Sequence, residues 1–151
     1  QATGDPEALK QLSIASTAAG MAFSNAGLGI DHALAHSLGG VFDVMHGIVH
    51  PILLPPIMRF NLPSCPEKMH RIGATVLGRR HTDSNGLALA GIEWLEDFFQ
   101  SFQIPTRLGE ILPSGTDLMP ICHMATLDAC MLSNPRPASP DDLFTLCQEV
   151  W

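Results

Sequence analysis

The sequence from His32 to Gly47 reads HALAHSLGGVFDVMHG and forms the centre of a longer stretch, Gly27 to Asn61. Four of the seven histidines and five of the glycines of the chain fall within that longer stretch. Most of the side chains around these histidines are apolar, and buried polar groups need partners. A metal ion or a polar ligand is therefore an economical explanation for the cluster, and we expect the rest of the chain to be its helical scaffold.

The pattern of apolar residues predicts an all-α fold. No convincing alternation of apolar and polar residues, which is typical of half-buried strands, occurs in the sequence. Helix-start signals recur instead, as in the pairs Asp5-Pro6 and Ser139-Pro140. A chain of 151 residues suits one domain. We predict a single helical domain over residues 1–151, with about seven helices.

Capping residues, glycines and prolines set the expected helix boundaries. Gly39 and Gly40 should end the second helix, and a capping box of Ser64 and Glu67 should begin the fourth. The third helix is apolar on all sides, which predicts a buried central helix kinked by its prolines. The expected helices are Pro6–Asn25, Ile30–Leu38, Gly47–Phe60, one from Ser64 to Leu77, Ser84–Phe102 capped by Asp83, Asp117–Met131, and one from Ser139 to the C-terminus. A stripe of Leu87, Leu95, Phe98, Phe99 and Phe102 should face the core.

Composition excludes several functional classes. The formal net charge is −7 with only 8 Lys and Arg residues, so the basic footprint that nucleic-acid binding requires is missing. No apolar run reaches the roughly 18 residues of a membrane span, and no signal peptide is visible. The four cysteines form no C-x-x-C pair, which predicts reduced, mostly buried thiols in a cytoplasmic protein.

The two ends of the sequence differ. Gln1 is not an initiator methionine, so we expect the chain to be processed or trimmed from a longer protein. The capped last helix, which should run to Trp151, predicts a natural C-terminus.

Spacing alone leaves two interpretations of the histidines open. His32 and His36 are four residues apart, so on a helix they share a face and can present two imidazoles to one metal. His46 and His50 repeat the spacing, although Pro51 disfavours helical geometry at His50. Either these histidines bind a metal, with Asp31 or Asp43 orienting an imidazole, or they form ordinary hydrogen bonds within a helical core.

Gly27–Asn61 resembles the signature region of the iron-containing (group III) alcohol dehydrogenase family. The family pattern is H-x-x-x-H-x-L-G, six residues, H-G, five residues, then L-L-P-x-x-M-R-x-N. It matches here from His32 to Asn61. The segments Gly20–Gly29 and Asn134–Pro137 match as well. The resemblance covers essentially the whole chain as the C-terminal helical domain of that family, a dehydroquinate synthase-like fold.

The resemblance implies roles for individual histidines. His32 and His46 match two of the four metal ligands of the family, which are ligands for Fe²⁺, or for Zn²⁺ in some relatives. His36 matches a histidine beside the metal and the nicotinamide, with a role in proton transfer, so it is the expected catalytic and cofactor-binding residue. His50 falls where the family usually has other residues, and we expect a structural role for it. The remaining three, His70, His81 and His123, match nothing functional.

The sequence also departs from the family. The other two ligands are an Asp and a His spaced D-x-x-x-H, and no such pair occurs here. The dinucleotide-binding α/β domain and any G-x-G-x-x-G motif are absent too. The chain thus holds half of the implied metal site and none of the main NAD(P) site.

We therefore expect an NAD(P)-dependent, metal-dependent alcohol dehydrogenase that transfers hydride from a small alcohol, with these residues alone inactive. The expected partners are an N-terminal dinucleotide-binding domain and a small alcohol or aldehyde, while nucleic acid and membrane are excluded and a homo-oligomer is left open. One rival is a non-enzymatic helical domain that binds metal or a partner. Another is a relative with different chemistry, a maleylacetate reductase or a polyol dehydrogenase.

Overall fold

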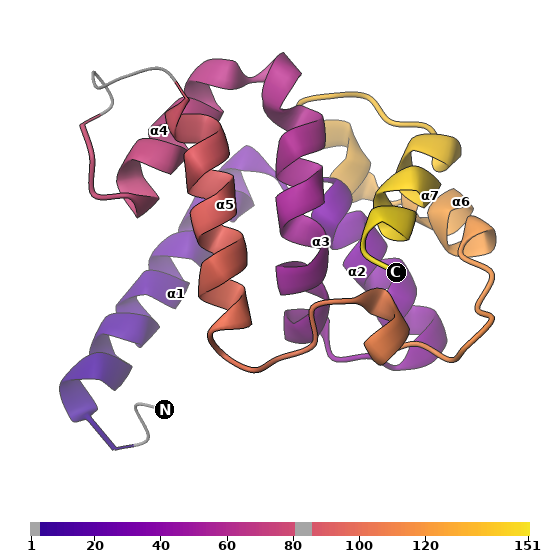
Figure 1. Cartoon of the computed structure of the whole chain (residues 1–151), viewed down its shortest axis with the longest axis horizontal. Helices are drawn as coiled ribbons and strands as arrows, with labels where there is room; N and C mark the ends of the chain where they lie inside the picture. Colours follow the sequence, from indigo (N-terminus) through magenta and orange to yellow (C-terminus); the bar gives the residue numbers. More distant parts are fainter. Residues whose placement is uncertain (1–3, 81–85) are drawn as a thin grey trace.

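The structure is a computed structural model that describes residues 4–80 and 86–151, and within these ranges it contains helices and no strand. The prediction of an all-α fold with about seven helices is confirmed (Figure 1). The α-helices are α1 (Pro6–Ala26), α2 (Ile30–Phe42), α3 (His46–Asn61), α4 (Pro66–Val76), α5 (Leu87–Gln100), α6 (Met119–Thr126) and α7 (Pro140–Glu149). Three short 3₁₀ helices, η1 (Leu62–Ser64), η2 (Leu108–Glu110) and η3 (Ala129–Ser133), connect them.

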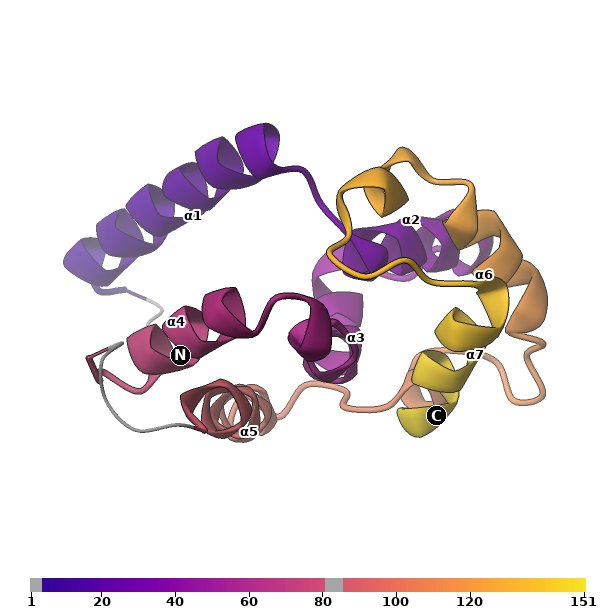
Figure 2. The ribbon, with the colours of Figure 1, turned by 90° about the horizontal axis from the view of Figure 1, so that it is seen from above.

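Helix α3 is the buried central helix that its apolar sequence predicts. It packs against α2 and α7 on one side and against α5 on the other (Figures 1 and 2). Eight of its 16 residues are buried, and it continues as one helix through Pro51, Pro55 and Pro56. The larger hydrophobic core joins α2, α3, α6 and α7, and a smaller one lies where α3, α4 and α5 meet. Burial on both sides fixes the position of α3, whose first two turns carry two of the histidines.

Helix α1 differs from the other six α-helices of the described ranges because none of its residues is buried. Its start agrees with the sequence, since the Asp5 carboxylate accepts a hydrogen bond from the backbone N–H of Glu7 at 3.0 Å. Figure 2 shows α1 extending away from the rest of the chain, toward the side of α4. It ends at Gly27, whose φ of 77° is a left-handed conformation that favours glycine.

The expected end of the second helix is wrong. Helix α2 continues through Gly39 and Gly40 to Phe42, and Asp43 ends it with a left-handed φ of 54°. A glycine inside a helix costs only about 1 kcal/mol relative to alanine. Burial of the apolar face of α2, together with partial burial of Phe42 against the core, outweighs that cost.

Two other expected boundaries are also wrong. Ser64 lies at the end of η1 and does not cap α4, which Cys65 precedes without any capping bond from its side chain. The expected helix up to Met131 stops at Thr126, because Asp128 begins η3 by accepting a hydrogen bond from the backbone N–H of Cys130. The expected cap at Asp83 lies outside the described residues. The start of α7 is as predicted, since Ser139 and Asp142 form a capping box.

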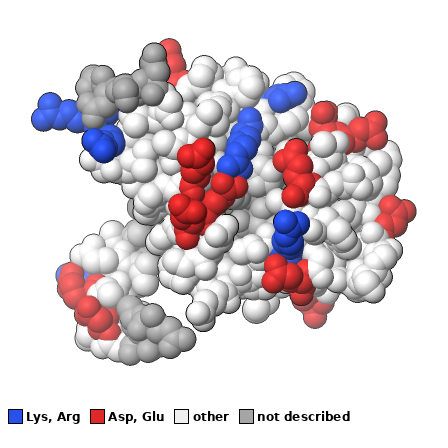
Figure 3. Space-filling model, in the orientation of Figure 1, with Lys and Arg blue, Asp and Glu red and all other residues white. Residues whose placement is uncertain are grey.

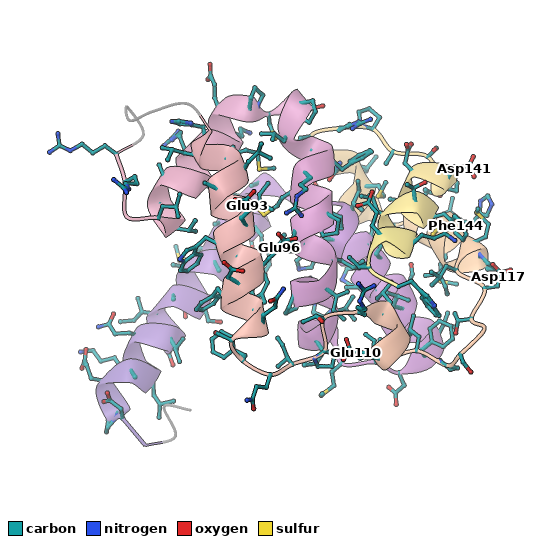
Figure 4. The ribbon with its side chains drawn as sticks, viewed as in Figure 1. Glu93, Glu96, Glu110, Asp117, Asp141 and Phe144 are labelled. Carbon is teal, nitrogen blue, oxygen red and sulfur yellow. The ribbon has the colours of Figure 1, made fainter. Side chains whose placement is uncertain are left out.

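The predicted core-facing stripe of α5 is only partly correct. Leu87 is buried, but the side chains of Phe98 and Phe102 are exposed and extend an aromatic row that includes Trp94. On its other flank α5 is tied to α3: Arg59 donates two hydrogen bonds to the carboxylate of Glu96, one of them from Nη1 at 2.7 Å. Figure 4 shows Glu96 on the side of α5 that faces α3.

The cysteines and the surface charge agree with the composition. All four cysteines are free thiols, and Cys122 and Cys147 are buried. No helix in the described ranges combines the length and the hydrophobicity that a bilayer span requires. On the face shown in Figure 3, acidic side chains are interspersed with a few basic ones, and the described residues visible there form no continuous basic patch.

Candidate metal centre

Helices α2 and α3 bring four histidine rings together. His32 and His36 lie on α2, and His46 and His50 lie in the first two turns of α3. The ring centroid of His32 lies 5.3 Å from that of His46 and 4.5 Å from that of His50. The rings of His36 and His46 stack with centroids 5.5 Å apart. The two i, i+4 pairs therefore form one cluster.

A single turn between the helices makes this juxtaposition. Asp43 adopts a left-handed conformation, and its backbone N–H closes α2 on the carbonyl of Gly39 at 3.0 Å. The chain then needs only Val44 and Met45 to reach the first residue of α3. The same turn that shortens the expected loop thus places His46 beside the histidines of α2.

The expectation that Pro51 keeps His50 out of helical geometry is wrong. His50 lies within α3, four residues after His46 on the same face. Pro51 only deprives the carbonyl of Gly47 of its helical partner, and Gly47 is exposed, so water can bond that carbonyl. As a result, Nε2 of His50 lies 2.9 Å from Nε2 of His46.

One group of potential ligands consists of His32, His46 and His50. One ring nitrogen of each lies within 4.8 Å of those of the other two. Asp31 Oδ2 lies 2.5 Å from Nδ1 of His50 and 3.9 Å from Nδ1 of His32. Asp31 is thus the carboxylate that orients an imidazole, as the sequence suggested. Its other oxygen, Oδ1, is buried and has no hydrogen-bond partner among residues 4–80 and 86–151.

His36 belongs to a separate group with two residues of η3. Its Nδ1 lies 2.8 Å from Oδ2 of Asp128, while Oδ1 of Asp128 accepts a hydrogen bond from the backbone N–H of Cys130 at 2.7 Å. These two bonds lower the pKa of Asp128 to about 2. Burial and the neighbouring Asp128 raise the pKa of the Cys130 thiol to about 11. At neutral pH the carboxylate is therefore ionised and the thiol keeps its proton.

The electrostatics at His32 and His46 favour the neutral imidazole. Burial lowers the pKa of His32, and the nearby His50 lowers it further, although Asp31 opposes the shift. Burial likewise lowers the pKa of His46, with His50 as the next cause. A neutral imidazole keeps the lone pair with which it binds a metal.

The donor set fits a divalent transition metal. Imidazole suits zinc and iron, and metal–nitrogen bonds of roughly 2.0–2.1 Å hold neighbouring ligand nitrogens about 3 Å apart. The 2.9 Å between Nε2 of His46 and Nε2 of His50 agrees with such an arrangement. The unpartnered Oδ1 of Asp31 marks a buried carboxylate whose charge a cation would balance.

The sequence missed Asp128 and Cys130 as neighbours of His36. Both residues fell inside a helix that was expected to reach Met131, so no signal distinguished them from the other residues of that helix. Their D-x-C spacing, with the Asp capping η3, is the one local feature that could have drawn attention. The remaining histidines contribute nothing to the described cluster. His70 lies on α4 and His123 on α6, whereas His81 lies outside the described residues.

Known proteins resemble the chain over its full length. The profile of the "Fe-containing alcohol dehydrogenase family, C-terminal" matches residues 1–151. The 1,3-propanediol dehydrogenase of Klebsiella pneumoniae is 34% identical over 149 residues, which cover 96% of this chain and 38% of that protein. The lactaldehyde reductase of Escherichia coli (strain K12) is 33% identical over 153 residues, which cover 98% of this chain and 39% of that protein.

Solved structures agree with these sequence matches. An alcohol dehydrogenase from Oenococcus oeni superposes with a TM-score of 0.78 at 32% identity, over 88% of this chain and 35% of that one. A 1,3-propanediol oxidoreductase superposes with a TM-score of 0.74 at 34% identity, over the same shares. The chain spans about two fifths of the length of the curated relatives that it matches.

Proposed function

Because the chain belongs to the iron-containing alcohol dehydrogenase family, as its C-terminal domain, we propose that it supplies the metal-binding part of an NAD(P)-dependent alcohol dehydrogenase. The observation that carries this proposal is the convergence of His32 and His46, from α2 and α3, within one group of potential ligands. The relatives named for 1,3-propanediol, lactaldehyde and butanol point to small alcohols and aldehydes as the substrate class.

In this proposal His32 and His46 hold a divalent ion, Fe²⁺ or Zn²⁺. A bound ion of this kind supplies Lewis acidity toward the alcohol oxygen. The two ligands come from separate helices, each buried on its other face, so their rings are held in place before substrate arrives.

His36 is proposed to move the proton of the alcohol. Since the carboxylate of Asp128 is ionised and only accepts hydrogen bonds, Nδ1 of His36 must donate, and in the neutral imidazole the lone pair is then on Nε2. A neutral imidazole nitrogen suits proton transfer near pH 7. The side chain of His36 is 44% exposed, so substrate and nicotinamide can reach it.

The rest of the reaction requires residues that this chain lacks. The sequence has no G-x-G-x-x-G motif, and the chain spans only about two fifths of its relatives. We propose that an N-terminal dinucleotide-binding domain binds the nicotinamide and completes the metal site, and that the 151 residues alone are inactive. Relatives are named for both NAD and NADPH, so either nicotinamide remains a candidate.

The test uses the natural-length protein, by which we mean this chain together with the proposed N-terminal dinucleotide-binding domain. It is assayed with a panel of small alcohols and both nicotinamides. His32→Ala and His46→Ala should abolish both alcohol oxidation and the metal content measured by mass spectrometry. His123→Ala, on the exposed surface of α6, is the matched control and should change neither. Full metal content and activity in His32→Ala would overturn the metal-site proposal. A metal-loaded protein that oxidises none of the alcohols would overturn the dehydrogenase proposal. Hydride transfer by the 151-residue chain alone would refute its proposed inactivity.

A further inference from the structure

We infer that His50 is a third imidazole ligand of the metal, supplied by this chain in addition to His32 and His46. The inference rests on the proposed function, because it concerns the same metal site. It goes beyond the family resemblance, in which the position of His50 usually holds other residues and the ligands that this chain matches are His32 and His46.

The position of His50 carries the first part of the argument. Its Nε2 faces Nε2 of His46 at 2.9 Å, and its ring centroid lies 4.5 Å from that of His32. The potential ligand atoms of all three residues lie within 4.8 Å of one another. His36, in contrast, is turned toward Asp128 through Nδ1. Three of the four clustered imidazoles therefore form one group of potential ligands, and the fourth belongs to another group.

The protonation of His50 carries the second part. Asp31 Oδ2 lies 2.5 Å from Nδ1 of His50, and a carboxylate oxygen at this position accepts a hydrogen bond from Nδ1–H. In the tautomer with the hydrogen on Nδ1, the lone pair is on Nε2. Nε2 of His46 lies 2.9 Å from it. A cation can bind both nitrogens at once. A metal-binding histidine commonly donates its other ring N–H to a carboxylate in this way.

The charge balance around Asp31 carries the third part. Its side chain is only 14% exposed, and its Oδ1 is buried without a hydrogen-bond partner in the part of the chain that the structure describes. Among the described residues, the Asp31 carboxylate lies within ion-pair distance of two side chains, His32 and His50. A partly buried carboxylate costs free energy unless a positive charge or hydrogen bonds compensate it. A divalent ion held by the three imidazoles would supply that charge.

Three nitrogen ligands from one chain should suffice for measurable metal binding without further protein groups. Three protein ligands with one open position is the arrangement of many catalytic zinc sites. The 151-residue chain should therefore bind one Zn²⁺ or Co²⁺ per molecule. A site of only His32 and His46 would bind far more weakly.

The test is a titration of the 151-residue chain with Co²⁺, followed by its visible absorption, and with Zn²⁺ in competition with a coloured chelator. Removal of a residue that is hydrogen-bonded to a metal ligand costs about 10–100-fold in metal affinity. Removal of the ligand itself should therefore cost at least about 100-fold. We expect His50→Ala to lose at least that much and Asp31→Asn to lose about 10–100-fold. His123→Ala should match the wild type. His50→Gln keeps a polar side chain and tests the same loss if His50→Ala does not fold.

The outcomes separate this inference from the proposed function. If His50→Ala and His50→Gln bind as tightly as the wild type while His32→Ala does not bind, His50 is no ligand and the His32–His46 site stands. If His32→Ala also binds like the wild type, the proposed metal site itself fails. If the 151-residue chain binds no metal, the metal content of the natural-length protein decides. A lower metal content in its His50→Gln variant supports the inference, and an unchanged metal content overturns it.

Discussion

Nδ1 of His36 and Oδ2 of Asp128 lie 2.8 Å apart, although 92 positions separate the two residues in the sequence. The contact joins α2 to η3, which also pack against each other. It holds the imidazole by a carboxylate whose pKa is lowered to about 2, so the carboxylate is ionised near neutral pH. A tertiary contact thus decides which nitrogen of His36 carries the proton.

The first prediction concerns Asp128→Asn in the natural-length protein. The amide oxygen can still accept from the backbone N–H of Cys130, so the start of η3 should persist. The amide nitrogen then faces Nδ1 of His36 and donates to it, which moves the imidazole proton to Nε2 and removes the base. We expect kcat/KM for alcohol oxidation to fall about 10²–10⁴-fold with unchanged metal content.

Asp141→Asn is the matched control for that experiment, because Asp141 is an exposed residue in the first turn of α7 (Figure 4). It should leave kcat/KM and its pH profile unchanged. A merely structural role for Asp128 would be indicated if Asp128→Asn lowered stability but left the pH profile of kcat/KM as in the wild type.

The second prediction concerns the pH dependence of stability. The folded-state pKa of Asp128 is about 2, below its ordinary value of 3.8. Its contribution is therefore fully present above the ordinary value and is lost as the pH falls through about 2. The difference in unfolding free energy between wild type and Asp128→Asn, from urea titrations, should be constant above about pH 5 and shrink at lower pH. A difference that stays constant from pH 7 to pH 2 would contradict this assignment.

The third prediction concerns the crossing of α4 and α5. A Cβ on Gly73 would lie 1.8 Å from the backbone oxygen of Leu87, and one on Gly91 would lie 2.4 Å from the Cα of Gly73. The helices thus touch backbone to backbone, with no flexible side chain that could yield. Gly73→Ala should lower the free energy of unfolding by about 1–3 kcal/mol or more.

Gly40→Ala is the control, because a Cβ at that position in α2 meets nothing within 4 Å. It should leave the stability unchanged or raise it by up to about 1 kcal/mol. Equal effects of the two substitutions in urea unfolding would show that glycine is not required at the crossing.

The fourth prediction concerns Asn134, which links the ends of two helices. Its amide exchanges two hydrogen bonds with the amide of Asn61 at the end of α3, and its Oδ1 accepts from the backbone N–H of Ile30 at the start of α2. Asn134→Ala leaves these partly buried groups unpaired. It should lower the free energy of unfolding by about 1–3 kcal/mol. Asn25→Ala, on exposed α1, should change it little, and a similar loss in both variants would refute the special role of Asn134.

Much of the fold could be predicted because its signals are local. The caps at Asp5 and Ser139 and the apolar run of α3 each act within one helix, and the structure confirms them. The end of α2 could not be predicted in this way. Gly39 and Gly40 are weak helix breakers whose cost is offset by burial against helices far along the chain.

The candidate site divides along the same line. The i, i+4 spacing predicted that His32 and His36 share a face of α2, but only the resemblance assigned them different roles. The structure supports a difference, since His36 is bonded to Asp128 and His32 is not. The proximity of His50 to His46 was missed because the local effect of Pro51 was overestimated. Asp128 was missed because its contact with His36 is purely tertiary.

The most direct measurement is an anomalous difference map from crystals of the metal-loaded protein, collected above the absorption edge of iron or zinc. The proposed function predicts a peak within bonding distance of the imidazole nitrogens of His32 and His46, and the further inference adds His50. A peak at the second candidate group of His36, Asp128 and Cys130, or no peak at the histidine cluster, would contradict the account.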